Sequence, residues 1–244
     1  MITSELANQI IAWRRYFHQY PELSLHENAT TEKIREILRS HQIAPRPAGN
    51  TGLCADITGT KAANGKTILL RADIDALGMD EQSDTPYRSL NPGAAHACGH
   101  DGHTAALLGA ARLLSENRNT FAGTVRLVFQ PAEEICKGAK QIIAAGELEN
   151  VDRVLGIHFM PSIHCGKIAT PAGPAMAGCD FFSIRVQGKG GHISTPQLAA
   201  DPLQPAAQIL IGLNTIAARR FSPLEEILVA VGKFSGGTQY NIIP

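Results

Sequence analysis

The N-terminal part of the chain carries apolar side chains at helical spacing. Intervals of three and four residues separate Leu6, Ile10, Trp13 and Phe17. This spacing predicts an amphipathic helix that ends before Pro21. A second helix is predicted over residues 30–40, with Ile34, Ile37 and Leu38 on its apolar face. The chain therefore begins with two helices that each bury one side.

The pattern then changes to short runs of apolar and β-branched residues, which are typical of buried strands. Such runs occupy residues 53–58, 67–72, 124–129 and 153–159, and helical patterns at 104–114 and 137–145 lie between the later ones. Strands that alternate with helices predict an α/β fold with parallel strand pairs. In such sheets, ligands bind beyond the carboxyl ends of the strands.

From about residue 178 the pattern changes again. Residues 181–187 alternate like a strand, residues 202–219 have a helical pattern, and residues 227–234 predict a second strand. The Pro- and Gly-rich stretch at 171–175, just before this part, is typical of a hinge. We therefore predict two domains, at residues 1–177 and 178–244.

Composition narrows the class of protein. The 244 residues are 44% hydrophobic, which is enough to bury a core. Lysine plus arginine and aspartate plus glutamate each total 22, so a formal charge of zero gives no basis for binding nucleic acid or a membrane surface. No run approaches the roughly 20 apolar residues of a transmembrane helix, and the N-terminus lacks the apolar run of a signal peptide. The five cysteines follow no CxxC spacing, which favours a reducing compartment, so we expect a cytoplasmic globular protein.

Several segments set metal-binding or acid/base side chains just past a predicted strand. The first contains Asp73 and Asp75, after the strand predicted at 67–72. Two carboxylates at i and i+2 leave a strand on the same side. An aspartate after a strand is more often a turn or a helix cap, so this segment alone carries little weight.

Residues 96–103, with the sequence HACGHDGH, are harder to explain by packing, because three histidines, a cysteine and an aspartate lie so close together. The glycines let the backbone wrap tightly, so that Cys98 and His100 can converge on one metal ion. The structural alternative is a polar loop in which Asp101 or His103 caps the following helix. A Cys98 nucleophile activated by His100 is a second alternative, although no oxyanion-hole signature supports it.

Two more segments follow later strands. Glu133 and Glu134 are adjacent carboxylates, which repel each other unless a cation or a proton separates their roles. In a metal hydrolase one can hold the ion while the other takes a proton from water, although a solvated acidic turn explains the pair equally well. His158 ends an apolar strand, where a lone histidine is more often a core residue. Together with Cys98, His100 and Glu134, however, it would complete a mixed S, N and O metal set on one edge of the sheet.

The segment GKGGH at 188–192 follows the strand predicted at 181–187. It superficially resembles a phosphate-binding loop, but it has neither GxxxxGK[ST] nor a GxGxxG that leads into a helix. We therefore interpret His192 as an exposed histidine that is mobile enough to reach a substrate.

Taken in order, these segments resemble the amidohydrolase branch of the aminoacylase/carboxypeptidase-G2-like metallopeptidases. This branch includes hippurate hydrolases, N-acyl-amino-acid amidohydrolases and the plant hydrolases of indole-3-acetic acid conjugates. The matching segments are ADIDAL (72–77), HACGHDGHTAALLGAARLL (96–114), GTVRLVFQPAEE (123–134), GIH (156–158), GKGGHISTP (188–196) and NIIP (241–244). The resemblance implies an α/β fold with a zinc-peptidase-like mixed sheet flanked by helices, and an α+β lid domain that also dimerises.

The resemblance also implies roles for single residues. The ligands of a pair of divalent ions, zinc or manganese with cobalt or nickel as further candidates, match Cys98, His100, Glu134 and His158. Glu133 matches the general base, and Asp75 matches the carboxylate that orients a ligand. His192 matches the lid histidine that reaches into the partner subunit's site to stabilise the oxyanion.

The sequence departs from the family pattern in two respects. Gly78 stands where the family usually has proline, and Asp80 stands where it usually has glutamate. The chain also stops at Pro244, whereas the resemblance implies more lid sequence and one further histidine ligand downstream. We therefore expect both domains to be incomplete, and the chain alone to bind fewer than two ions per subunit and to be poorly active.

These observations predict metal-dependent hydrolysis of the amide bond of N-acyl or N-aroyl amino acids. The expected partners are a small-molecule substrate and a second copy of the chain, joined through the lid as a homodimer, and neither nucleic acid nor membrane is expected. The first alternative is a catalytically impaired remnant that binds metal or dimerises. A thiol hydrolase without metal is the second.

Overall fold

The chain forms two compact units, Met1–Ala169 and Thr170–Pro244. The computed structural model describes residues 2–62 and 65–244. Within these ranges, none of the helices combines the length and the apolar character needed to cross a membrane. The break between the units lies beside the predicted hinge at 171–175. The assignment of residues 1–177 to a catalytic domain and 178–244 to a lid remains a prediction.

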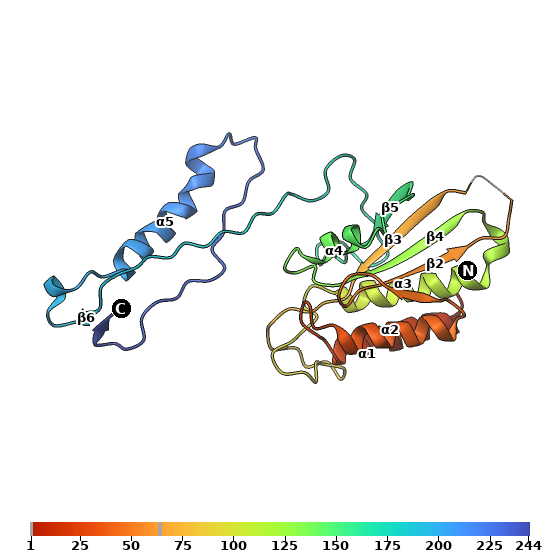
Figure 1. Ribbon diagram of the computed structural model, residues 1–244, viewed down its shortest axis with the longest axis horizontal. Coiled ribbons are helices and arrows are strands. Elements are labelled where there is room, and N and C mark those ends of the chain that lie inside the picture. Colours follow the sequence, from red (N-terminus) through yellow and green to blue (C-terminus); the bar gives the residue numbers. More distant parts are fainter. Residues whose placement is uncertain (1, 63–64) are drawn as a thin grey trace. The chain divides into compact units, whose positions relative to one another are not determined.

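A five-stranded mixed sheet forms the centre of the first unit (Figure 1). Its strands are β1 (Pro45–Pro47), β2 (Leu53–Thr58), β3 (Thr67–Asp73), β4 (Thr124–Gln130) and β5 (Arg153–Gly156), in the spatial order β1-β2-β4-β3-β5. β3 runs parallel to β4 and to β5, while β2 is antiparallel to β1 and β4. The predicted α/β fold with parallel pairs and a mixed sheet flanked by helices is confirmed. The carboxyl ends of β3, β4 and β5 therefore lie at one edge.

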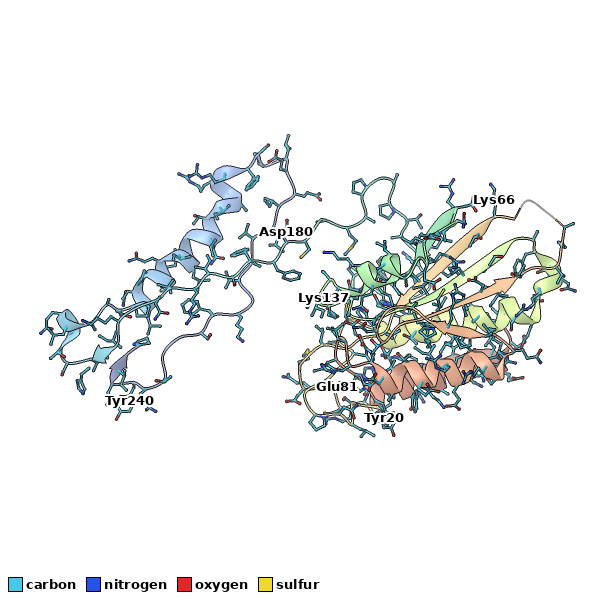
Figure 2. All side chains as sticks on the ribbon, in the orientation of Figure 1. Tyr20, Lys66, Glu81, Lys137, Asp180 and Tyr240 are labelled. Carbon is cyan, nitrogen blue, oxygen red and sulfur yellow. The ribbon has the colours of Figure 1, made fainter. Side chains whose placement is uncertain are left out.

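Helices cover one face of this sheet. They are α1 (Ser4–Gln19), α2 (Asn28–Ser40) and α3 (His100–Glu116), which is followed by the 3-10 turn η1 (Arg118–Thr120). They bury Phe17, Leu38 and Leu108 against the sheet, and Figure 2 shows side chains filling the space between the two layers. Each such burial contributes about 1.5–3 kcal/mol relative to exposure. The two predicted N-terminal helices are confirmed, and α1 ends just before Pro21, which cannot continue a helix.

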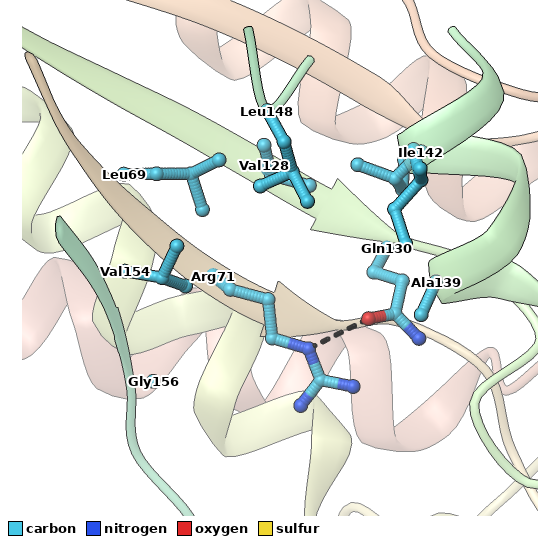
Figure 3. A pocket seen from close by; sticks show the side chains of 10 residues that line it. Leu69, Arg71, Val128, Gln130, Ala139, Ile142, Leu148, Val154 and Gly156 are labelled. Atoms are coloured by element: carbon cyan, nitrogen blue, oxygen red, sulfur yellow. Dashed lines mark hydrogen bonds between the residues drawn. The ribbon is translucent and has the colours of Figure 1, made fainter. Parts of the chain in front are cut away.

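The opposite face of the sheet carries a smaller cluster. Side chains alternate across a strand, so Cys54, Leu69 and Val128 point away from the main core and pack with Ile142 of α4 (Gly138–Ala144). Beside them lies a hollow of about 370 Å³, lined mainly by aliphatic side chains and by the hydrogen-bonded Arg71 and Gln130 (Figure 3). None of the predicted metal ligands lines this hollow.

The strand predicted at 153–159 is three residues too long. The ladder between β3 and β5 ends where Arg71 pairs with Gly156. Beyond that point, the backbone N–H of Phe159 donates to a side chain, His103 Nε2, and not to a neighbouring strand. His158 therefore lies in a segment that has left the sheet.

The second unit contains α5 (Leu203–Arg220), the 3-10 turn η2 (Pro196–Leu198) and a two-stranded sheet of β6 (Gly191–His192) and β7 (Ile242–Ile243). The helix predicted over 202–219 is confirmed. The strands predicted at 181–187 and 227–234 are wrong, because no described segment forms a ladder with either, and a strand needs a hydrogen-bonded neighbour. The pairing of β6 with β7 brings together two of the motifs, GKGGHISTP and NIIP.

Candidate metal centre

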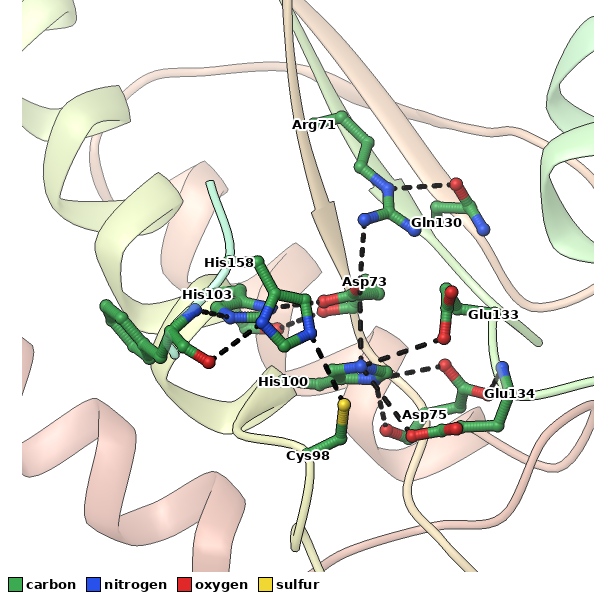
Figure 4. A network of polar contacts seen from close by, with 12 residues as sticks. Arg71, Asp73, Asp75, Cys98, His100, His103, Gln130, Glu133, Glu134 and His158 are labelled. Atoms are coloured by element: carbon green, nitrogen blue, oxygen red, sulfur yellow. Dashed lines mark hydrogen bonds and ion pairs between the residues drawn. The ribbon is translucent and has the colours of Figure 1, made fainter. Parts of the chain in front are cut away.

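The predicted site residues of the first unit converge at the carboxyl ends of the parallel strands. Asp73, the last residue of β3, pairs with Gln130, the last residue of β4, so the segments after these strands leave the sheet side by side. α3 begins at the same edge with His100, and the segment after β5 brings His158 there (Figure 4). The sheet topology thus assembles a site from four separate motifs.

His100 is the central side chain of this cluster and is 1% exposed. The chain can turn sharply into α3 because Gly99 before it has φ of 89°, in the left-handed region that favours glycine. His100 Nδ1 donates to the backbone oxygen of Asp75 at 2.9 Å. In the neutral ring this bond places the proton on Nδ1, so Nε2 presents a lone pair to the site.

Two glutamates face this lone pair at similar distances. Glu133 Oε2 lies 3.8 Å and Glu134 Oε1 3.7 Å from His100 Nε2. Their side chains differ in burial, however, at 39% exposed for Glu133 and 19% for Glu134. The backbone N–H of Glu134 donates to Asp75 Oδ2 at 3.1 Å, and the Ser24 hydroxyl donates to the same oxygen at 2.6 Å. Asp75 thus holds the backbone of the acidic pair at Glu134.

Cys98 and His158 close the other side of the cluster. The Cys98 Sγ lies 3.4 Å from His158 Nε2. Burial, together with the nearby carboxylates of Glu134 and Asp73, raises the pKa of the Cys98 thiol to about 12. An anionic surrounding of this kind opposes the nucleophilic thiolate that a thiol hydrolase needs.

The donors of the cluster fit divalent cations. Sulfur, nitrogen and carboxylate oxygen gather in groups whose ligand atoms lie within 4.8 Å of one another, one formed by Cys98, His100 and His158 and another by His100, Glu133 and Glu134. Within the described part of the chain, His100 Nε2 and Glu134 Oε1 are buried without a hydrogen-bond partner. Burial raises the pKa of Glu134, and repulsion from Glu133 adds to the shift. A bound cation would offset the repulsion between the two glutamates and would give the buried nitrogen and oxygen a partner.

His192 lies in the second unit, on β6, and is exposed. Its Nδ1 accepts from the backbone N–H of Ser194 at 3.2 Å and lies 2.7 Å from the hydroxyl of the same residue. Because Nδ1 accepts, the proton of the neutral ring is on Nε2, which makes that atom a hydrogen-bond donor.

Asp101 and His103, which the sequence offered as possible helix caps, have other partners in the structure. Asp101 does not cap α3, because its Oδ2 pairs with His18 Nδ1 at 2.8 Å and with Arg14 Nε at 2.7 Å. Hydrogen bonding to Asp101 raises the pKa of His18. His103 is not a cap either, because its Nδ1 lies 2.6 Å from Asp73 Oδ1. The partners of Asp101 and His103 come from distant segments of the chain. The sequence therefore signalled only that polar residues are dense in HACGHDGH, and not which residues they contact.

A model of Peptidase family M20/M25/M40 matches residues 69–239, well over half of the chain. The chain belongs to this family. The match includes all four motif segments that form the cluster in the first unit. It also includes His192 in the second unit. The resemblance found in the sequence is thereby confirmed.

The relatives of this M20-family chain are hydrolases by name. An N-acetyl-L-cysteine deacetylase of Bacillus subtilis (strain 168) is 46% identical, over 99% of this chain and 58% of the relative. An N-acyl-L-amino acid amidohydrolase of Geobacillus stearothermophilus is 40% identical, over 100% of this chain and 66% of the relative. The crystal structure of a Bacillus subtilis protein described as a dinuclear metal binding peptidase from the M20 family matches with a TM-score of 0.69 at 36% identity, over 88% of this chain and 57% of that one. The chain thus spans less than two thirds of the length of these relatives.

Proposed function

We propose that this chain carries the metal-binding part of an amidohydrolase that cleaves the amide bond of N-acyl or N-aroyl amino acids. The observation that carries the proposal is the convergence of sulfur, nitrogen and oxygen donors around His100, with the carboxylates of Glu133 and Glu134 facing its Nε2. Membership of the M20 family supports the reaction class. The names of the relatives, a deacetylase and an N-acyl amino acid amidohydrolase, support the substrate class.

The proposed ligands of two divalent ions, zinc or manganese, are Cys98, His100, Glu134 and His158. When bound, such ions lower the pKa of water and polarise an acyl carbonyl. Asp75 orients the His100 ring through its backbone oxygen and holds the backbone of Glu134 through its carboxylate, so it helps to position both ligands.

Glu133 is the proposed general base. Its side chain is twice as exposed as that of Glu134 and is therefore better placed to meet a substrate. It takes a proton from the attacking water and passes it to the leaving amine. A positioned base of this kind contributes about 10²- to 10⁴-fold to the rate.

His192 is the proposed donor to the oxyanion that develops on the acyl oxygen. Ser194 supports this role, because its N–H holds the imidazole in the tautomer that carries a proton on Nε2. The resemblance implies that this histidine acts on the site of a second subunit, so the proposal includes a homodimer.

Metal removal tests the proposed function. We expect exhaustive chelation to abolish hydrolysis of an N-acetyl amino acid or of hippurate, and a divalent ion to restore it, because Glu133 alone cannot activate a water molecule whose pKa no ion has lowered. The measurement is amine release before chelation, after it and after addition of zinc or manganese. Full activity in metal-free protein would support a thiol hydrolase. Metal binding without any turnover, in this chain and in a longer one, would support the remnant.

A further inference from the structure

His103 is buried next to the proposed ligands, and both of its ring nitrogens are engaged. Its Nδ1 lies 2.6 Å from Asp73 Oδ1, and its Nε2 accepts from the backbone N–H of Phe159 at 2.9 Å. An amide N–H can only donate, so Nε2 must carry the lone pair and the proton must be on Nδ1. His103 is therefore a neutral imidazole that donates to Asp73 and accepts from Phe159.

Asp73 is itself held firmly. The Arg71 guanidinium donates to its Oδ2 at 2.7 Å, and the Thr104 hydroxyl donates to its backbone oxygen at 3.0 Å. With one carboxylate oxygen bound to Arg71, Asp73 presents the other to His103 Nδ1 and so fixes the orientation of the His103 ring.

The peptide groups of Phe159 connect His103 to a proposed metal ligand. Its N–H donates to His103, and its backbone oxygen accepts from His158 Nδ1 at 2.8 Å. This second bond places the proton of His158 on Nδ1, so that Nε2 presents a lone pair to Cys98 Sγ, 3.4 Å away. The orientation of His158 therefore depends on where the Phe159 backbone lies.

The first turn of α3 is shaped to receive this segment. The rings of His103 and Phe159 pack with centroids 5.0 Å apart, and those of His103 and His158 with centroids 4.7 Å apart. Gly102 leaves room for the Phe159 ring, because a Cβ there would lie 2.2 Å from its Cε2. Gly102 and His103 thus both face the segment that follows β5.

We propose that His103 is a positioning residue, which holds the segment after β5 through the Phe159 backbone and so aims His158 Nε2 at the metal site. Among the residues that the structure describes, the segment has no ladder partner beyond Gly156, so this hydrogen bond replaces the support that the sheet gives elsewhere. The link to metal binding rests on the proposed function, but the hydrogen bond to Phe159 does not.

His103 could instead be a ligand, since it forms a third possible metal group with Asp73 and His100. Its ring has no lone pair to spare, however, because Nδ1 carries the proton and Nε2 accepts from Phe159. The geometry therefore favours a role in positioning over a role in coordination.

The first experiment needs no metal. Hydrogen exchange at the Phe159 amide is measured by NMR in the metal-free chain, for His103→Asn, which can still donate to Asp73 but is too short to reach Phe159, and for His103→Gln, which can reach the amide with an acceptor. We expect exchange to accelerate about three- to tenfold in His103→Asn and to stay close to the parent rate in His103→Gln. The matched control is His164→Asn, an exposed histidine of the same unit. Equal exchange in the parent and His103→Asn would overturn the proposal.

The second experiment measures zinc and cobalt affinity of the same variants, with the cobalt absorption spectrum as a record of the ligand set. We expect His103→Asn to bind about 10- to 100-fold more weakly, as is usual when a partner of a metal ligand is lost, and His103→Gln to recover most of the affinity. The exposed control His164→Asn should bind like the parent.

The outcomes distinguish a positioning role of His103 from a role as a metal ligand, and both from a failure of the proposed function. A parent chain that binds no metal would contradict the proposed function and leave the exchange result to decide the role of His103. Metal binding of equal strength in the parent and His103→Asn would overturn the positioning role. Loss of one whole ion with no recovery in His103→Gln would also overturn it, in favour of coordination.

Discussion

At the scale of single residues, burial distinguishes side chains that the sequence presents as equivalent. Glu133 and Glu134 are neighbours at nearly the same distance from His100 Nε2, yet of these two described residues it is Glu134 that has a buried oxygen without a hydrogen-bond partner. The backbone N–H of Glu134 is also tied to Asp75. Coordination suits the fixed, buried carboxylate, and proton transfer suits the more exposed one.

Substitution of each glutamate by glutamine separates the two roles. Glu133→Gln should lower turnover by at least about 10²-fold and leave metal content near that of the parent, because the amide cannot accept the proton. Glu134→Gln should lower metal content as well, because the amide is a poorer ligand. Metal analysis and amine release are measured on the same samples. Equal loss of metal in both variants would mean that the roles within the pair are assigned wrongly.

At the scale of elements, the three central strands of the first unit's sheet were predicted well, whereas the edge strand β1 was not predicted and the edge strand β5 was predicted three residues too long. β2 has the predicted bounds, and β3 and β4 each extend one residue beyond them, because alternation and β-branching coincide there with a real ladder. Residues 181–187 and 227–234 show the same alternation but form no ladder among the described residues. The alternation of apolar and polar residues indicates a preference for extended backbone, whereas the presence of a neighbouring strand to pair with depends on the rest of the fold.

The same limit applies to the site. The motif residues that converge on His100 could be predicted, because their residue types and their places after strands are visible in the sequence. The bond between His103 and the Phe159 backbone could not, because an N–H group has no signature in the sequence. The sequence reveals which side chains can bind a cation, but not which hydrogen bonds hold those side chains in position.

One ion pair, between β1 and the residues after α4, contributes to how stability depends on pH. Arg46 of β1 donates from Nε and Nη2 to the two carboxylate oxygens of Glu147, at 3.1 and 2.5 Å, and Glu147 is 5% exposed. Burial acts to raise the pKa of Glu147, but the hydrogen bonds from Arg46 outweigh it and lower the pKa below its ordinary value of 4.5. The pair therefore stabilises the fold above pH 4.5, and this contribution is lost as the pH falls through the lowered pKa.

Glu147→Gln should reduce the free energy of unfolding at pH 7 by about 1–2 kcal/mol, since the loss is that of a charged hydrogen bond to a partly exposed arginine. The difference from the parent should shrink as the pH falls below 4.5. Urea unfolding followed by circular dichroism at several pH values measures both effects. Glu116→Gln, which removes a surface pair with Arg112, is the control and should change little. A difference that stayed constant down to pH 2 would contradict the role of the ionised Glu147.

At the scale of the whole molecule, the proposed reaction needs both units, because the metal donors belong to the first and His192 to the second. Within each unit, the side chains that the proposed reaction needs are already positioned by contacts of that unit alone. The donors face one another at the strand ends, and His192 is held by Ser194 with Nε2 as a donor. The resemblance to the amidohydrolase branch implies that the two parts meet across a dimer.

Mixing two inactive variants tests this arrangement. Glu133→Gln retains His192, and His192→Ala retains Glu133, so one of the two hybrid sites in a mixed dimer holds both groups. We expect the mixture to regain up to about a quarter of the activity at full exchange, in a longer chain if this one has no measurable turnover. Subunit exchange is monitored with a fluorescent label on each variant. Exchange without any recovery would contradict action between subunits.

The distance along the chain between Cys98 and His158 has a consequence for synthesis. The two side chains meet in the folded site but are 60 residues apart. At roughly 5–20 residues per second, a ribosome adds His158 about 3–12 s after Cys98. The thiol must survive this interval and then the wait for a cation. In the folded site its raised pKa keeps it protonated, and a protonated thiol resists oxidation. Burial of the sulfur, together with the carboxylates that would attract the metal, therefore also protects the thiol until the metal arrives.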